Sequence, residues 1–200
     1  MPLLYHNNNS ISNVTSFAQV PSGNPVLLST ATASASSSIS FTSGIDSTYD
    51  VYKFEFINIH PSNDVAEFRF QGSTDGGSSY GVTITSTAIL SQHDEADTTT
   101  SLAYNASKDL AQSTGDQVLI NEIGNGADEN GSGNLYLFNP SSTTYVKHWL
   151  SRTSNYQGDD YIQDRYFAGY FNTTSAINAI IFRMNTGNID AGTIKMYGIK

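Results

Sequence analysis

The sequence predicts an all-β protein: an antiparallel β-sandwich of the jelly-roll type with an extended N-terminal arm. Short runs of β-branched and aromatic residues alternate with polar residues at period two, and clusters of Gly, Pro, Asn, Asp and Ser separate them. No segment has the periodicity of an amphipathic helix. Charged residues make up only 14% of the 200 residues. Ser, Thr, Asn and Gly take their place, and these residues suit turns and solvent-facing strand positions.

The clearest alternation lies in two neighbouring runs, 50–59 and 65–71. Each run places aromatic residues on one face, and a turn cluster, His60-Pro61-Ser62-Asn63-Asp64, separates the two runs. We therefore expect an antiparallel pair of adjacent strands that buries Phe54, Phe56, Phe68 and Phe70.

Further strands are expected at similar spacing. They are Tyr80–Thr87, Thr99–Tyr104, Gln117–Ile123, Asn134–Phe138, Thr143–Leu150, Gln163–Phe171, Ala176–Met184 and Gly192–Ile199. In the strand around residue 148, the alternation of Val146, His148 and Leu150 predicts that His148 shares the inner face. Many short strands divided by frequent turns are typical of a two-sheet sandwich or jelly roll.

Residues 1–30 contain few residues that could pack in a core. We expect them to form an extended N-terminal arm and residues 31–200 to form the jelly-roll-like sandwich domain. Isolated hydrophobic residues in a polar chain can act as anchors on a neighbouring subunit. These candidate assembly residues are Leu3, Leu4, Tyr5, Ile11, Val14 and Phe17. The alternative is a loosely held leader that crosses the domain surface. The small-residue tract Thr30–Ser38 permits either a linker or an edge strand.

Charge and composition exclude several classes of partner. The net charge is −9 with only 9 Lys and Arg residues, which argues against nucleic acid. There is no cysteine, so no disulfide or thiolate metal site can form. No apolar run approaches the ~20 residues of a membrane span. The polar residues after Met1-Pro2-Leu3-Leu4 leave no secretory h-region, so we expect synthesis in a cytoplasm and no membrane partner.

The motifs that could carry chemistry favour structural roles. Ser73–Tyr80 resembles the Asp-box turn, in which Asp75 accepts backbone hydrogen bonds and the glycines take positive φ. Asp128–Gly133 resembles half of a calcium loop but lacks the closing Glu and the flanking helices, so solvated charge is the better interpretation. The four histidines are scattered, and no nucleophile elbow or Walker loop is present. We therefore expect no enzyme activity, no cofactor and no metal site.

Three stretches carry a resemblance to a known family. They are Tyr52–Pro61 with Phe68–Ser73, then Phe138–His148, and finally Ala168–Asn178 with Gly187–Lys200. Together they resemble structural proteins of marine tailed bacteriophages, over roughly residues 45–200. The resemblance implies a virion protein on the particle exterior, either a capsid decoration or cement protein or a fibre or knob component. It also implies other capsid or tail proteins as partners and a homo-oligomer, with a trimer favoured.

A carbohydrate-binding module is the alternative function. It would use Trp149, Tyr156, Tyr161 and Tyr166, near the expected loop Ser154–Tyr161, as an exposed stacking platform for a host-surface glycan. The competing interpretation places these aromatic residues in the core or at a subunit interface, and it is the one we favour.

Overall fold

The computed structural model describes residues 24–200. Their regular secondary structure consists of β-strands alone, without a helix. The strands are β1 (Val26–Thr32), β2 (Ile39–Phe41), β3 (Val51–Pro61), β4 (Ala66–Ser73), β5 (Ile84–Asp94), β6 (Thr100–Tyr104), β7 (Gln117–Ile123), β8 (Gly131–Phe138), β9 (Lys147–Gln157), β10 (Tyr161–Phe171), β11 (Ala179–Met184) and β12 (Ile189–Ile199). Within these residues there is no helix that is long and apolar enough to cross a membrane.

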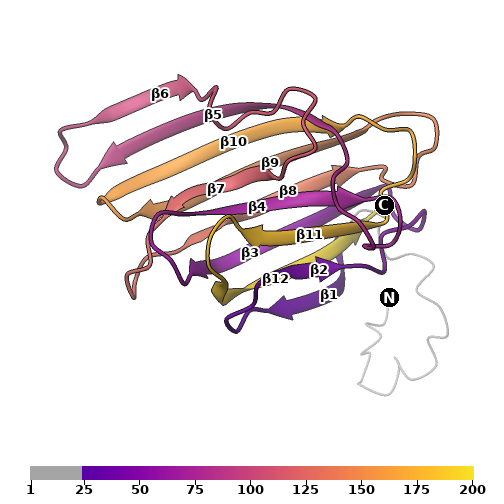
Figure 1. The fold of residues 1–200 in the computed structure, drawn as a ribbon, viewed down its shortest axis with the longest axis horizontal. Coiled ribbons are helices and arrows are strands. Elements are labelled where there is room, and N and C mark those ends of the chain that lie inside the picture. The colour runs from indigo at the N-terminus through magenta and orange to yellow at the C-terminus, as the bar shows by residue number, and fades with distance from the viewer. Residues whose placement is uncertain (1–23) are drawn as a thin grey trace, which may run out of the picture.

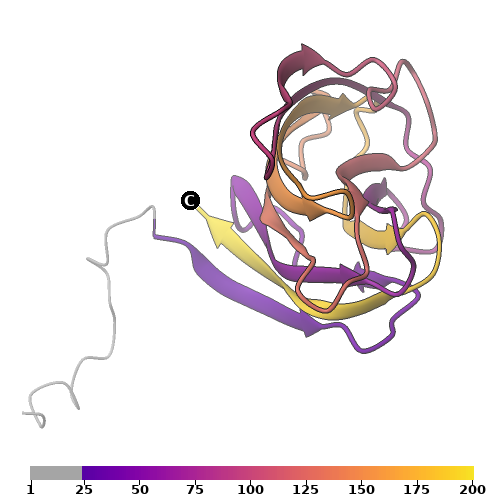
Figure 2. The ribbon, with the colours of Figure 1, turned by 90° about the vertical axis from the view of Figure 1, so that its left-hand side faces the viewer.

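The strands form two layers, and every pairing is antiparallel, which confirms the predicted all-β antiparallel fold. The large sheet has the order β1-β12-β3-β8-β9-β10-β5-β6, and the small sheet has the order β2-β11-β4-β7. A single residue pair, Ile123 with Gln157, joins β7 to β9 and so connects the two sheets. Figure 1 shows β6 and β1 at opposite margins of the molecule, and Figure 2 shows the strands curling around the core.

Aromatic rings from both sheets meet in the core. The ring of Phe56 in β3 lies 5.2 Å from the ring of Phe68 in β4, and both rings pack on Phe182 of β11. The predicted burial of Phe54, Phe56, Phe68 and Phe70 is thus confirmed. The predicted pairing is wrong, because β3 pairs with β8 and β12 while β4 pairs with β7 and β11. The two strands face each other across the core instead.

The alternation of β9 is the opposite of the predicted one. Its inner face carries Trp149 and a row of polar residues, whereas His148 and Leu150 are exposed. The prediction that His148 lies on the inner face is therefore wrong. Two of the inner polar side chains fasten β7 to β9: Thr153 Oγ1 donates to the carbonyl of Leu119 at 2.5 Å, and Asn155 Nδ2 donates to that of Asn121 at 3.1 Å. These bonds replace a backbone ladder between the sheets.

The first described strand belongs to the large sheet. Val26–Thr32 pairs with β12, so the predicted boundary at residue 30 falls inside β1. The sequence allowed either a linker or an edge strand for the Thr30–Ser38 tract, and its first residues, up to Thr32, belong to the edge strand β1. The candidate assembly residues Leu3, Leu4, Tyr5, Ile11, Val14 and Phe17 lie outside the described residues.

Two strands run further than the sequence predicted. β5 extends from Ile84 to Asp94, beyond the expected end at Thr87, and β9 runs to Gln157 through the expected loop. The β9 extension is rich in Ser, Thr, Asn and Gln, and the β5 extension ends on Ser, Gln, His and Asp. The weak β-propensity of several of these residues is overridden by pairing on both sides with neighbouring strands.

Candidate interaction surface

The outer face of the large sheet is hollowed where β8, β9, β10 and β5 lie side by side. The hollow has a volume of about 350 Å³. Its rim and floor combine exposed apolar and aromatic side chains with a few polar ones. The lining residues are Thr87, Ile89, Asn134, Tyr136, Leu150, Ser151, Arg152, Tyr166, Phe167 and Ala168.

Strand register explains why the hollow lies here. Tyr166 stands directly between Ile89 of β5 and Arg152 of β9, and these three side chains form one row across the sheet. In the next row, Ala168 stands between Thr87 and Leu150. Because the Ala168 side chain is a single methyl group flanked by larger residues, the surface is depressed above it. A second, smaller hollow of about 260 Å³ continues over Ala168 and Gly169.

An ion pair holds Tyr166 in place. Arg152 donates two hydrogen bonds to Asp164, with Nε–Oδ1 and Nη2–Oδ2 distances of 3.1 and 2.9 Å. The Arg152 guanidinium carbon also lies 4.6 Å from the centre of the Tyr166 ring. The hydrogen bonds to Asp164 raise the pKa of Arg152 above its ordinary value. The guanidinium thus lies over the Tyr166 ring beside the hollow as a cation–π contact.

The structure does not bring the four predicted platform residues together. Trp149 is fully buried, and its indole packs edge-on against Phe70 at 5.1 Å. A surface platform therefore cannot use Trp149. Its position agrees with the favoured interpretation, in which it is a core residue. Tyr156 shares the outer face with Tyr166, but it lies opposite Ile162, four residues away along β10, which is about 13 Å.

The other two tyrosines sit at the end of the β9–β10 hairpin. Tyr156 donates a hydrogen bond to Asp160 at 2.7 Å, which raises the pKa of the phenol. Tyr161 begins β10 with the side-chain parity of the buried Gln163 and Arg165, so it is directed away from the outer face. Of the four residues only Tyr166 lines the hollow.

Sequence reasoning missed Ile89, Tyr136 and Leu150 as surface residues. The available signal was Trp149 itself: a tryptophan alternating with Lys147, Ser151 and Thr153 marks the inner face of the strand. With that parity, Leu150 and Arg152 must point outward. Tyr136 pairs with Leu150, so it follows onto the same face.

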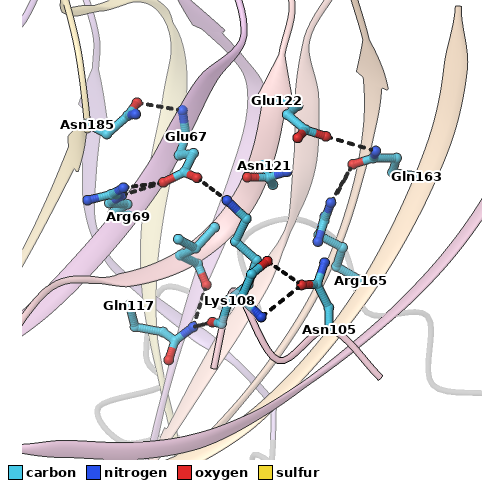
Figure 3. Close-up of polar contacts among 12 residues, drawn as sticks. Glu67, Arg69, Asn105, Lys108, Gln117, Asn121, Glu122, Gln163, Arg165 and Asn185 are labelled. Atoms are coloured by element: carbon cyan, nitrogen blue, oxygen red, sulfur yellow. Dashed lines mark hydrogen bonds and ion pairs between the residues drawn. The ribbon is translucent and has the colours of Figure 1, made fainter. Parts of the chain in front are cut away.

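A cluster of buried and partly buried polar side chains comes from β4, β10 and the segment between β6 and β7 (Figure 3). Glu67 is contacted by both Arg69 and Lys108. Burial raises the pKa of Glu67, but the hydrogen bonds from the two cations outweigh that effect and the net pKa is lowered.

The same cluster holds a buried guanidinium. Arg165 donates through Nη2 to Gln163 Oε1 at 2.8 Å, and burial lowers the pKa of Arg165 to about 10. Among residues 24–200, its Nη1 has no hydrogen-bond partner, and neither do Oδ1 of Asn121 and Oδ1 of Asn155. Gln163 of β10 also donates through Nε2 to Glu122 Oε2 of β7 at 3.4 Å, so we assign the cluster a structural role.

The acidic and histidine-containing segments do not converge. The Glu129 carboxylate accepts a hydrogen bond from the Gly126 amide within its own loop. No group of three or more His, Asp or Glu side chains with metal-binding geometry occurs in residues 24–200. His60 contacts the Gly126 carbonyl at 3.1 Å and His93 contacts Asp97 at 3.1 Å, so each has a local partner.

The turn 73–80 has the geometry expected of an Asp-box turn. Asp75 accepts hydrogen bonds from Ser73 Oγ at 2.6 Å and from the Ser79 amide at 2.9 Å, and Gly76 and Gly77 both have positive φ. These bonds lower the pKa of Asp75 to about 2. The turn is not a hairpin, since it connects β4 to β5, which belong to different sheets.

Comparison with known proteins gives no identification: no family model, no curated protein and no solved structure matches the chain.

Proposed function

We propose that this chain is a non-enzymatic structural protein of a bacteriophage particle, a jelly-roll subunit that meets neighbouring proteins through the outer face of its large sheet. The observation that carries the proposal is the order of the strands. Eight of the strands lie side by side as two groups of four, in the spatial orders β1-β12-β3-β8 and β2-β11-β4-β7. This is the order produced when a pair of antiparallel ribbons is rolled up into two facing sheets, and jelly rolls of this kind build viral capsid and lectin domains.

The remaining strands support an assembly role. The hairpins β5–β6 and β9–β10 add to one margin of the large sheet and extend it past the small sheet. This extension carries exposed apolar residues, among them Ile89 at 44%, Leu150 at 49% and Leu102 at 77% exposure. Exposed apolar patches on one face of a protein are typical of protein interaction sites. The sequence resemblance of residues 45–200 to tailed-phage virion proteins supplies the choice of particle.

Mass spectrometry of purified virus particles, from the genome that encodes this chain, tests the proposal. We expect the protein at many copies per particle, and imaging of particles that lack it should lose a feature of the exterior. A particle preparation free of this chain, with the chain found only in the infected-cell lysate, would overturn the proposal. Imaging also distinguishes a capsid decoration protein from a fibre or knob component.

Glycan binding is the second candidate, and the Tyr166 ring beside Asn134 and Arg152 is the observation that favours it. Aromatic rings stack on sugar faces while neighbouring polar groups accept or donate hydrogen bonds. A glycan array probed with the protein and with Tyr166→Ala tests this candidate. Tyr145→Ala is the matched control, since Tyr145 is 72% exposed and does not line the hollow. Binding that Tyr166→Ala alone abolishes would support it; a blank array would reject it.

A further inference from the structure

In residues 24–200, the strands β1, β2 and β6 each have one edge without a paired strand. These edges are protected to different degrees against pairing with another chain. β2 has only three residues, and β1 is interrupted by a bulge between Leu27 and Ser29. By contrast, β6 pairs with β5 in unbroken register over Thr100–Tyr104. Its sequence, Thr-Ser-Leu-Ala-Tyr, contains no charge and no proline. Natural edge strands are usually blunted by a charge, a proline, a bulge or short length, and β6 has none of these.

Both faces of β6 are uncovered. All five residues are exposed, with Leu102 at 77% and Tyr104 at 56%. On the outer face, Tyr104 stands opposite Ile89 of β5, which in turn stands opposite Tyr166 of β10, and both are exposed; Leu102 stands opposite Ser91. β6 thus forms the margin of the large sheet (Figure 1), and apolar or aromatic side chains continue from Tyr104 through Ile89 to Tyr166.

The backbone of β6 offers a ready hydrogen-bonding edge. The Asp94 amide donates to Thr99 O at 3.2 Å, and the Asn105 amide donates to Ala88 O at 2.9 Å, so these odd-numbered positions bond to β5. In an antiparallel pair, successive residues point their N–H and C=O groups alternately toward and away from the partner. The N–H and C=O groups of Thr100, Leu102 and Tyr104 are consequently directed to the free edge.

We propose that β6 pairs with β6 of a second copy of this chain, antiparallel about a two-fold axis at Leu102. Leu102 then lies opposite Leu102 of the second copy, and Thr100 lies opposite Tyr104 of the second copy. All of these residues point their backbone groups outward, so each can donate and accept a hydrogen bond across the axis. The two large sheets become one continuous sheet. This pairing does not depend on the proposed virion role.

β6 is a strand along which a second copy can approach without meeting its own charge. Each chain carries a net charge of −9, so two copies repel each other over most of their surfaces. At a two-fold axis each residue near the centre meets itself or a close neighbour, and a charged residue there would face its own charge. The uncharged stretch Thr100–Tyr104 avoids this repulsion.

Light scattering on the full-length protein after size-exclusion chromatography tests the pairing. We expect a dimer, and we expect Leu102→Lys to raise its dissociation constant by roughly 100-fold or more, because two lysines then face each other. Leu27→Lys is the matched control, since Leu27 is also an exposed leucine, at 52%, on the other margin of the same sheet. It should leave the dimer unchanged.

Cysteine cross-linking provides a second measurement that does not depend on affinity. The chain has no cysteine, so the single cysteine in Leu102→Cys can form a disulfide only between copies. Hydrogen-bonded residues opposite each other in antiparallel strands have Cα atoms about 5.5 Å apart, which a disulfide spans. Rapid dimer formation by Leu102→Cys, with slow formation by Leu27→Cys, would support the pairing. A wild-type monomer or trimer, or equal cross-linking rates for the two variants, would overturn it.

Discussion

Phe182 is the residue whose removal should destabilise the fold most. Its ring is fully buried in β11, between the two sheets. Five rings surround it, with centroid distances of 5.2 Å to Phe56, 5.3 Å to Phe54, 5.6 Å to Phe68, 6.1 Å to Phe41 and 6.4 Å to Phe70. Replacement by alanine leaves a cavity that these rings cannot fill, because each is held by its own strand.

The expected cost of Phe182→Ala follows from burial and ring contacts. Truncation of a buried phenylalanine costs about 3–5 kcal/mol, and well-oriented aromatic pairs contribute about 0.5–1.5 kcal/mol beyond burial. We therefore expect a loss near the upper end, about 4–5 kcal/mol, which lowers Tm by roughly 10–20 °C in a domain of this size. Thermal and urea unfolding followed by circular dichroism measure it.

Two further variants make this prediction specific. Phe182→Leu keeps most of the buried volume and should recover more than half of the lost stability. Tyr145→Ala removes an aromatic ring that is 72% exposed, and we expect a change within about 0.5 kcal/mol. A loss below about 1.5 kcal/mol for Phe182→Ala would refute the placement of this ring at the centre of the core.

Three other perturbations follow from the structure. Gly169→Ala should cost about 1–3 kcal/mol in urea unfolding, because the added Cβ would lie 2.8 Å from Thr85 O and against the Trp149 indole; a Trp149→Phe background should relieve part of that cost. Glu67→Gln should cost about 2 kcal/mol near neutral pH, since it loses charged hydrogen bonds from Arg69 and Lys108. Because the pKa of Glu67 is lowered in the folded state, its contribution to stability is complete above the ordinary pKa of 4.5 and is lost as the pH falls through the pKa of the folded state. The stabilities of Glu67→Gln and wild type should therefore converge in acid. A difference in unfolding free energy that stays constant down to pH 3 would contradict this assignment. Deletion of residues 1–23 should leave a β-rich domain that melts cooperatively, because β1 begins only at Val26; an insoluble product would show that these residues complete the core.

The sequence was sufficient for the class of fold because period-two alternation depends only on which side of a strand is buried. The aromatic face of residues 52–56 and that of residues 66–70 were both recognised as buried. Their relation was not, since a short turn between two strands favours a hairpin, and yet the tertiary fold sends β4 into the other sheet. Sequence alternation gives the buried face of each strand but not the sheet to which that strand belongs.

The candidate surface was harder to predict, for a related reason. In β9, serine, threonine and asparagine occupy buried positions because they bond to the carbonyls of β7, while leucine occupies an exposed one. Assignment of the inner face by hydrophobicity therefore gave the wrong parity. The parity error made Trp149 a candidate for a surface platform, although burial was the favoured interpretation, and it hid Leu150. Only the pairing of β8, β9, β10 and β5 reveals the hollow that these strands share.

The pairing of early strands with late ones has a consequence for folding. β12 inserts between β1 and β3, and β11 inserts between β2 and β4. Both insertions join segments separated by most of the chain, so their loop-closure entropy must be overcome before the aromatic core contributes any stability. The hairpins β5–β6 and β9–β10 close locally and can form within microseconds. A ribosome-bound chain that ends before residue 179 thus has its local hairpins available but both halves of its core incomplete, with β3 and β4 each missing a neighbour. Folding of the core is then expected to wait until β11 and β12 have been synthesised, and chaperone protection of the incomplete sheets should matter most before that point.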